Sequence, residues 1–159
     1  MKYPFSVPLV GPWLYRRSVK GLAARARQGD MAAVRNLAGI FCTSCDETAR
    51  DIARTALCSL TSQPAIDTFC AESLQRDNAA LLGIAIDRNY LPAYPGMQAL
   101  FLFVTGQRER YALLDPQPHR PLLASGYAQA PERVRSHTRI AAKKCGQCPV
   151  LTAAFMGME

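Results

Sequence analysis

The cysteines are the residues of this sequence whose spacing most resembles a chemical site. Two C-x-x-C pairs are present, Cys42 with Cys45 and Cys145 with Cys148. Four thiolates spaced in this way can hold a tetrahedral zinc ion. The two pairs are, however, about 100 residues apart, whereas the second pair of a structural zinc site usually follows much sooner. We therefore expect no metal site.

The second cysteine pair also has the spacing of a thioredoxin-like redox pair. That chemistry requires the first cysteine at the N-terminus of a helix, where the helix dipole lowers the pKa of the thiol. Cys145 instead follows a predicted basic helix, where the dipole acts in the opposite direction, and Lys143 and Lys144 offset this only in part. A zinc- or redox-dependent switch is therefore the third of our functional hypotheses, and thiols in a reducing cytoplasm are expected.

No residues with the spacing of a catalytic site are found. His119 lies between prolines and His137 lies in a predicted basic helix, and neither has a nucleophile or a carboxylate at an activating spacing. Gly106 and Gly126 are isolated, so there is no glycine-rich phosphate loop. We expect a protein that is not an enzyme, with no catalytic residues and no cofactor.

Positive charge is concentrated near the two ends of the chain. The formal net charge is +7, although residues 29–132 hold 8 basic and 11 acidic residues. Neither residues 1–28 nor residues 133–144 contain an acidic residue. The candidate partner-binding residues near the N-terminus are Arg16, Arg17, Lys20, Arg25 and Arg27. Those near the C-terminus are Arg133, Arg135, Arg139, Lys143 and Lys144.

These two clusters have an ordinary and a functional interpretation. A run of charge is most often a solvated helix face. However, Arg135, Arg139 and Lys143 recur every four residues and so form one stripe, which can neutralise phosphates without sequence preference. The absence of acids favours an anionic partner, either a nucleic acid or the acidic face of another protein.

The stretch that organises the chain runs from residue 29 to residue 88 and repeats itself at an offset of about 32 residues. Each copy predicts two short amphipathic helices joined by a polar turn, and Asp46 or Ser44 can cap the second helix of the first copy. One such pair cannot cover its own apolar face, so we expect the copies to stack as an α-solenoid. An ordinary helical bundle is the alternative. The aligned pairs are Ala33 with Ala65, Leu37 with Phe69 and Ala53 with Ala85.

The rest of the chain predicts more helices and almost no strand. Further helices are expected over residues 18–28, 97–104, 108–114, 121–130 and 132–144. Pro4, Pro8 and Pro12 predict an extended arm over residues 1–17, which is too short to span a bilayer and lacks the pattern of a secretory signal. We expect one domain over residues 1–159, made of this arm, helical repeats over 18–145 and a tail over 146–159.

A family resemblance supports the repeat interpretation. The chain resembles the HEAT-like helical repeat module of large bacterial proteins over most of residues 20–145. The resemblance implies an interaction scaffold without catalytic residues, whose partner is a separate polypeptide. The CGQC segment at 145–148 departs from this module. The matching residues are Val104-Thr105-Gly106-Gln107, Arg110-Tyr111, Leu114-Asp115, Leu122-Leu123, Tyr127 and Arg139-Ile140.

Together these patterns favour an all-α fold, a right-handed superhelical stack of HEAT-like helix pairs. We expect a cytoplasmic, non-enzymatic scaffold or adaptor subunit that binds another protein and no membrane. The alternative is a basic subunit of a larger ribonucleoprotein or defence complex, which binds the RNA or DNA backbone through the two basic ends.

Overall fold

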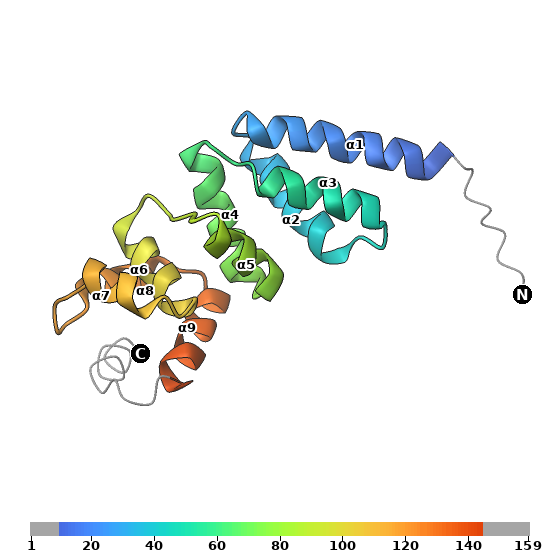
Figure 1. Ribbon diagram of the computed structural model, residues 1–159. Helices are drawn as coiled ribbons and strands as arrows, with labels where there is room; N and C mark the ends of the chain where they lie inside the picture. Colours follow the sequence, from blue (N-terminus) through green and yellow to red (C-terminus); the bar gives the residue numbers. More distant parts are fainter. Residues whose placement is uncertain (1–9, 145–159) are drawn as a thin grey trace, which may run out of the picture. The chain divides into compact units, whose positions relative to one another are not determined.

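The computed structural model describes residues 10–144, and the regular structure in that range is entirely α-helical (Figure 1). The predicted all-α class is therefore confirmed, with no strand between residues 10 and 144. None of the helices described combines the length and the apolar character needed to cross a membrane. The helices are α1 Val10–Arg27, α2 Met31–Thr43, α3 Glu47–Leu57, α4 Gln63–Arg76, α5 Ala79–Asp87, α6 Pro95–Val104, α7 Arg108–Leu114, α8 Pro121–Gln129 and α9 Glu132–Lys144.

The chain divides into two compact units, and the boundary between them along the chain lies between Phe69 and Cys70, inside α4. Unit 1 contains α1, α2, α3 and the first half of α4, and unit 2 contains the remaining helices. The single domain expected for residues 1–159 stays a prediction.

In unit 1, α1, α2 and α3 pack against one another in all three pairwise combinations (Figure 1). Leu37 of α2 and Leu57 of α3 are fully buried, and burying a side chain of this size stabilises a fold by about 2 kcal/mol. Many of their buried neighbours are alanines, which let helices approach closely. Buried side chains of α1 to α3 include Val19, Ala23, Ala26, Ala33, Val34, Ala38, Ala49, Ala53 and Ala56.

Short polar side chains fix where three helices begin. Asp30 caps α2, Asp46 caps α3 and Asn78 caps α5, because each side chain accepts hydrogen bonds from backbone N–H groups of the first turn. The prediction of Asp46 as a cap is thus confirmed. The hydroxyl of Ser44 instead accepts the N–H of Asp46 and supports the turn.

The sequence offset recurs in the helix starts. The start of α4 lies 32 residues after that of α2 (63 against 31), and the start of α5 lies 32 residues after that of α3 (79 against 47). This recurrence concerns only the positions at which the helices begin. The stacking of the helix pairs as a solenoid stays a prediction.

The extended arm predicted for residues 1–17 is wrong for residues 10–17. Helix α1 begins at Val10 instead of Ser18. Pro12 lies in the first turn of α1, where the missing N–H would have no intrahelical acceptor, so proline is tolerated there. Pro4 and Pro8 lie outside the described residues.

Unit 2 is built around α6, which packs against α7, α8 and α9. The helices α6 and α8 touch at Gly96 and Gly126, since a Cβ placed on Gly96 would lie 2.9 Å from the backbone nitrogen of Gly126. The Tyr94 hydroxyl, just before α6, is 2.6 Å from the hydroxyl of Ser125 and accepts a hydrogen bond from Gln129, both on α8. The predicted helices 108–114 and 132–144 match α7 and α9, and 97–104 and 121–130 differ from α6 and α8 by at most two residues.

Candidate functional site

The ten candidate basic residues fall in two different units. Five lie on α1 of unit 1 and five lie on α9 of unit 2. A helix was expected for eight of them, whereas Arg16 and Arg17 were expected in an extended arm and are instead helical. Several of them are engaged inside their own unit, which the sequence pattern did not predict.

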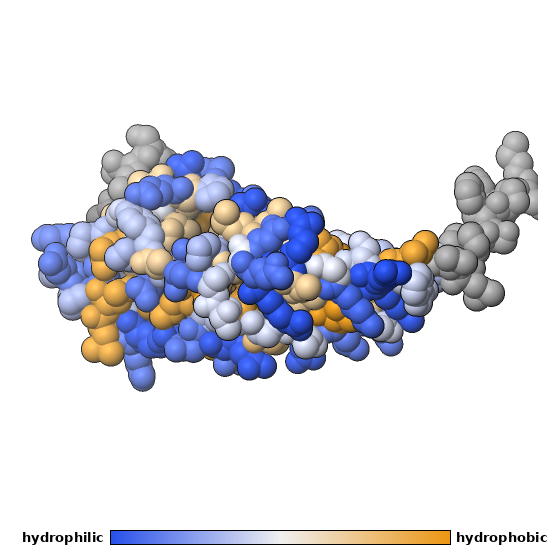
Figure 2. Space-filling model, turned by 90° about the horizontal axis from the view of Figure 1, so that it is seen from above, coloured by the Kyte–Doolittle hydropathy of each residue, from blue (hydrophilic) through white to orange (hydrophobic). Residues whose placement is uncertain are grey.

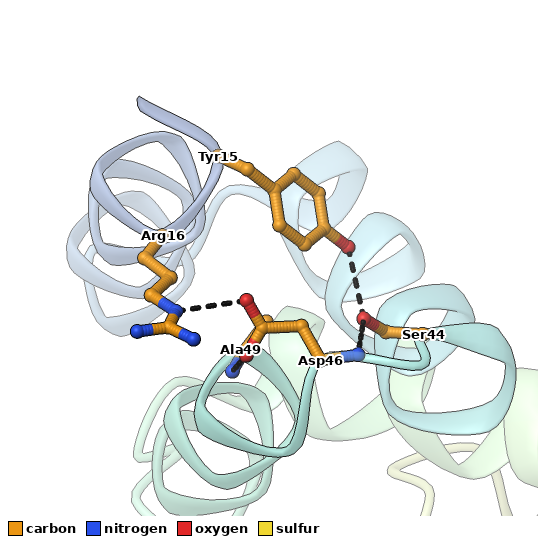
Figure 3. A network of polar contacts seen from close by, with 5 residues as sticks. All are labelled: Tyr15, Arg16, Ser44, Asp46 and Ala49. Atoms are coloured by element: carbon orange, nitrogen blue, oxygen red, sulfur yellow. Dashed lines mark hydrogen bonds and ion pairs between the residues drawn. The ribbon is translucent and has the colours of Figure 1, made fainter. Parts of the chain in front are cut away.

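Arg16 belongs to a network at the start of α3 (Figure 3). Its Nε–H donates to Asp46 Oδ2 at 2.8 Å, while Asp46 Oδ1 accepts the N–H of Ala49 at 3.1 Å. The guanidinium of Arg16, followed by the capping N–H groups, holds the pKa of the Asp46 carboxyl below its usual value. The Tyr15 hydroxyl donates to the hydroxyl of Ser44 in the same turn. Arg16 therefore links α1 to the α2–α3 turn.

Arg25 is engaged in a similar way at the start of α2. Its Nε–H donates to Asp30 Oδ2 at 2.7 Å, and Asp30 Oδ1 caps the helix. The N–H of Ala33 and then the Arg25 guanidinium lower the pKa of the Asp30 carboxyl. Two of the five α1 residues thus hold capping aspartates.

Lys20 and Arg27 line a groove between α1 and α3, which we call the α1–α3 groove. Its volume is about 480 Å³, and Thr48, Asp51 and Thr55 of α3 contribute to the opposite wall. Arg27 donates to the hydroxyl of Ser59 at 3.3 Å. The remaining lining residues are Ala23 and Ile52.

The side chains of Lys20 and Asp51 are exposed, and neither makes an ion pair or side-chain hydrogen bond with the described chain. The groove thus presents two unpaired charges of opposite sign on its two walls. Sequence reasoning missed this groove because it depends on how α1 packs against α3. The recurrence of its lining residues every three or four positions on both helices was the available signal.

Large hydrophobic side chains reach the surface beside the α1 cluster. Trp13 is 58% exposed and Leu14 is 52% exposed, and the guanidinium of Arg17 lies 5.4 Å from the centroid of the Trp13 ring. On the face drawn in Figure 2, hydrophobic residues reach the surface in small groups separated by hydrophilic ones. Such a pairing of aromatic and basic side chains is common where proteins bind partners.

In the α9 cluster, the stripe predicted from Arg135, Arg139 and Lys143 is partly neutralised. Glu132, one residue before the stretch without acids, pairs with Arg135 Nε at 3.2 Å and with Arg139 Nη2 at 2.6 Å. The hydrogen bond from Arg139 lowers the pKa of Glu132, and Glu132 followed by the Tyr127 hydroxyl raises that of Arg139.

The other cations of α9 are less engaged. Arg133, Lys143 and Lys144 are exposed and make no ion pair within residues 10–144. Lys144 lines a small pocket of about 170 Å³ in unit 2 together with Asp77 and His137. Its other lining residues are Val104, Ile140 and Ala141.

His137 makes contacts that fasten α9 to the end of α4. Its Nδ1 lies 3.2 Å from the carbonyl oxygen of Leu74, and its Nε2 lies 3.6 Å from Asp77 Oδ2. Among the described residues, the pocket beside it is lined by no serine, cysteine or threonine, so this histidine and carboxylate have no hydroxyl or thiol there to activate. The absence of enzymatic activity stays a prediction.

The metal and redox hypotheses receive no support from the described residues. Between residues 10 and 144, no three histidine, cysteine or acidic side chains gather in a group that could hold a metal ion. Cys145 and Cys148 lie outside the described residues, so their pairing with Cys42 and Cys45 stays untested.

Comparison with known proteins gives no further assignment. No protein-family model matches this chain, and neither a curated protein nor a solved structure matches it.

Proposed function

We propose that this protein is a non-enzymatic adaptor or scaffold subunit that binds another protein through the surface of its helices. The observation that carries the proposal is the α1–α3 groove, where the unpaired Lys20 and Asp51 face an open channel with an apolar lining. Charges of both signs beside apolar side chains are typical of surfaces that bind a protein partner, because the surface of such a partner also carries charges of both signs. The exposed Trp13 adds an aromatic side chain of the kind enriched at interfaces.

Affinity capture with the full chain tests this proposal. The immobilised protein is incubated with an extract of its own cells treated with nuclease, and each captured protein is then purified separately. We expect one of them to form a stoichiometric complex with the full chain on size-exclusion chromatography. The adaptor function would be rejected if proteins were captured only from an extract without nuclease treatment. It would also be rejected if the purified components formed no complex.

A nucleic-acid-binding function is the second candidate. It is supported by the six candidate cations without a carboxylate partner in the described chain, and by the stacking of Arg17 on Trp13. The six are Arg17, Lys20, Arg27, Arg133, Lys143 and Lys144. Lysines and arginines of this kind neutralise phosphates, and aromatic rings stack on bases. If this function holds, binding to random-sequence RNA or DNA weakens steeply with salt. No binding at low salt would exclude it.

We also propose that the helix pairs stack as HEAT-like repeats of an α-solenoid, as the sequence resemblance implies. The recurrence of helix starts at 32 residues supports this proposal. In such a stack, corresponding helices of successive pairs lie side by side. Methyl–methyl nuclear Overhauser effects between corresponding helices are therefore expected in solution, and their absence would favour an ordinary bundle.

A cytoplasmic location is proposed as well. It is supported by the four described cysteines, none of which is in a disulfide. Thiol labelling in intact cells tests it, because oxidised cysteines in the native protein would argue against a reducing compartment.

A further inference from the structure

The α1–α3 groove runs along the two helices that form it, because its lining residues recur at helical spacing on both walls. Lys20, Ala23 and Arg27 of α1 follow one another at intervals of three and four residues, as on one helix face. On α3 the lining begins at Thr48 and ends at Thr55, also seven residues later. Each wall therefore covers two turns, about 10.5 Å along the helix. A groove with this geometry runs along the helices and suits another helix laid beside them.

The α1 wall continues beyond the groove in the same register. Trp13, Arg16, Lys20, Ala23 and Arg27 follow one another at intervals of three, four, three and four residues, which is the spacing of a coiled-coil seam. The ion pair of Arg16 with Asp46, the cap of α3, shows that this stripe faces α3. Trp13 is the N-terminal residue of this stripe and is 58% exposed. A helix in the groove would meet an aromatic side chain there.

The charges of the groove specify the chemistry of such a helix. Lys20 and Arg27 stand two turns apart on the α1 wall, and the floor holds the apolar side chains of Ala23 and Ile52. A matching helix has an apolar stripe and acidic residues seven positions apart on the edge beside α1. Asp51 on the other wall would repel the phosphates of a nucleic acid but can pair with a basic residue of a protein.

We propose that the α1–α3 groove binds an acidic amphipathic helix of a partner protein, with Lys20 and Arg27 facing its carboxylates and Trp13 packing at its end. The proposal rests on the adaptor function and names the kind of segment that the adaptor recognises. Its charge pattern also makes the recognition directional, because reversing the helix in the groove would move the acidic edge from Lys20 towards Asp51.

An unbiased selection tests the proposal. Helical peptides from a randomised amphipathic library are selected for binding to the full chain. We expect the selected peptides to carry glutamate or aspartate at positions seven apart beside an apolar stripe. Their affinity should fall at least tenfold when Lys20 and Arg27 are both replaced by glutamate. The matched control replaces the exposed Arg133 and Lys143 by glutamate, which changes the net charge equally and should leave the affinity unchanged.

Trp13 provides an independent readout because it is the single tryptophan of the sequence. A peptide in the groove should shift the fluorescence emission of Trp13 to shorter wavelength. Asp51→Lys should lower the binding affinity of those peptides that carry a basic residue opposite position 51. Selected peptides without an acidic pattern, or insensitive to K20E and R27E, would overturn the proposal. So would self-association of the full chain that K20E and R27E abolish, since a second copy would then fill the groove.

The outcomes separate this inference from the adaptor function. If a purified cellular partner binds the full chain and the K20E/R27E variant equally well, the adaptor function stands and the groove proposal fails. If neither a partner nor a helical peptide binds, both fail.

Discussion

Replacing Gly126 by alanine is expected to destabilise unit 2, because the added methyl group has no room. A Cβ on Gly126 would lie 2.5 Å from the carbonyl carbon of Gly96 and closer still to its oxygen. These obstructing atoms are backbone atoms of α6, so no side-chain rotation can relieve the clash and the two helices must separate. Overpacking of this kind costs about 1–3 kcal/mol, and we expect the upper end of that range.

The gain in helix propensity offsets part of this cost. Alanine is favoured over glycine inside a helix by about 1 kcal/mol, so the net loss for Gly126→Ala is about 2 kcal/mol. Gly83 in the middle of α5 is the matched control, because a Cβ there would have nothing within 4 Å. Gly83→Ala is therefore expected to raise the free energy of unfolding by up to about 1 kcal/mol.

Urea denaturation followed by far-ultraviolet circular dichroism measures both effects. The two variants should shift the midpoint in opposite directions, Gly126→Ala to lower urea and Gly83→Ala to higher urea. Trp13 fluorescence follows unit 1 separately, since this tryptophan lies on α1. Equal or greater stability of Gly126→Ala than of the wild type would refute the close contact between α6 and α8.

Two further predictions concern the helix caps. Because the pKa of Asp46 is lowered in the fold, its stabilising effect is present above the unfolded pKa near 3.8 and is lost as pH falls through the lower folded value. The wild type should therefore lose more stability than Asp46→Ala between pH 6 and about pH 3 in urea denaturation, and equal losses would contradict the pairing with Arg16. Asn78→Ala should cost about 1 kcal/mol and Asn78→Gly only a few tenths, and equal midpoints for the two variants would argue against the cap of α5.

Local features of the sequence predicted most helix boundaries correctly. The helix over residues 108–114 and the helix over residues 132–144 have the predicted ends, and Asp46 caps α3 as predicted. Such signals are readable because a cap or a proline acts on backbone groups only a few residues away. The error at the start of α1 was also local, since Pro12 was treated as interior to a helix when it lies in the first turn.

The candidate site could be predicted only in part. The sequence placed eight of the ten basic residues on two helices, and both helices exist, but it placed Arg16 and Arg17 in an extended arm that is helical in the structure. It did not reveal that Arg16 pairs with Asp46, 30 positions away, or that Glu132 pairs with Arg139. A count of charges along the chain gives only the net charge of a segment. Whether a basic side chain is paired depends on whether a carboxylate lies near it in the folded structure.

By itself, the sequence determined that the described part of this chain is helical and where several of its helices start and stop, because amphipathic spacing and capping are short-range properties. Only the tertiary structure decided that α1 lies against α3 to form a groove and that Gly96 meets Gly126. It also decided that Lys20 stays unpaired in the described chain whereas Arg16 does not. These properties depend on which helix faces pack together. That choice is made by the whole buried surface, because each apolar stripe could be covered by several others.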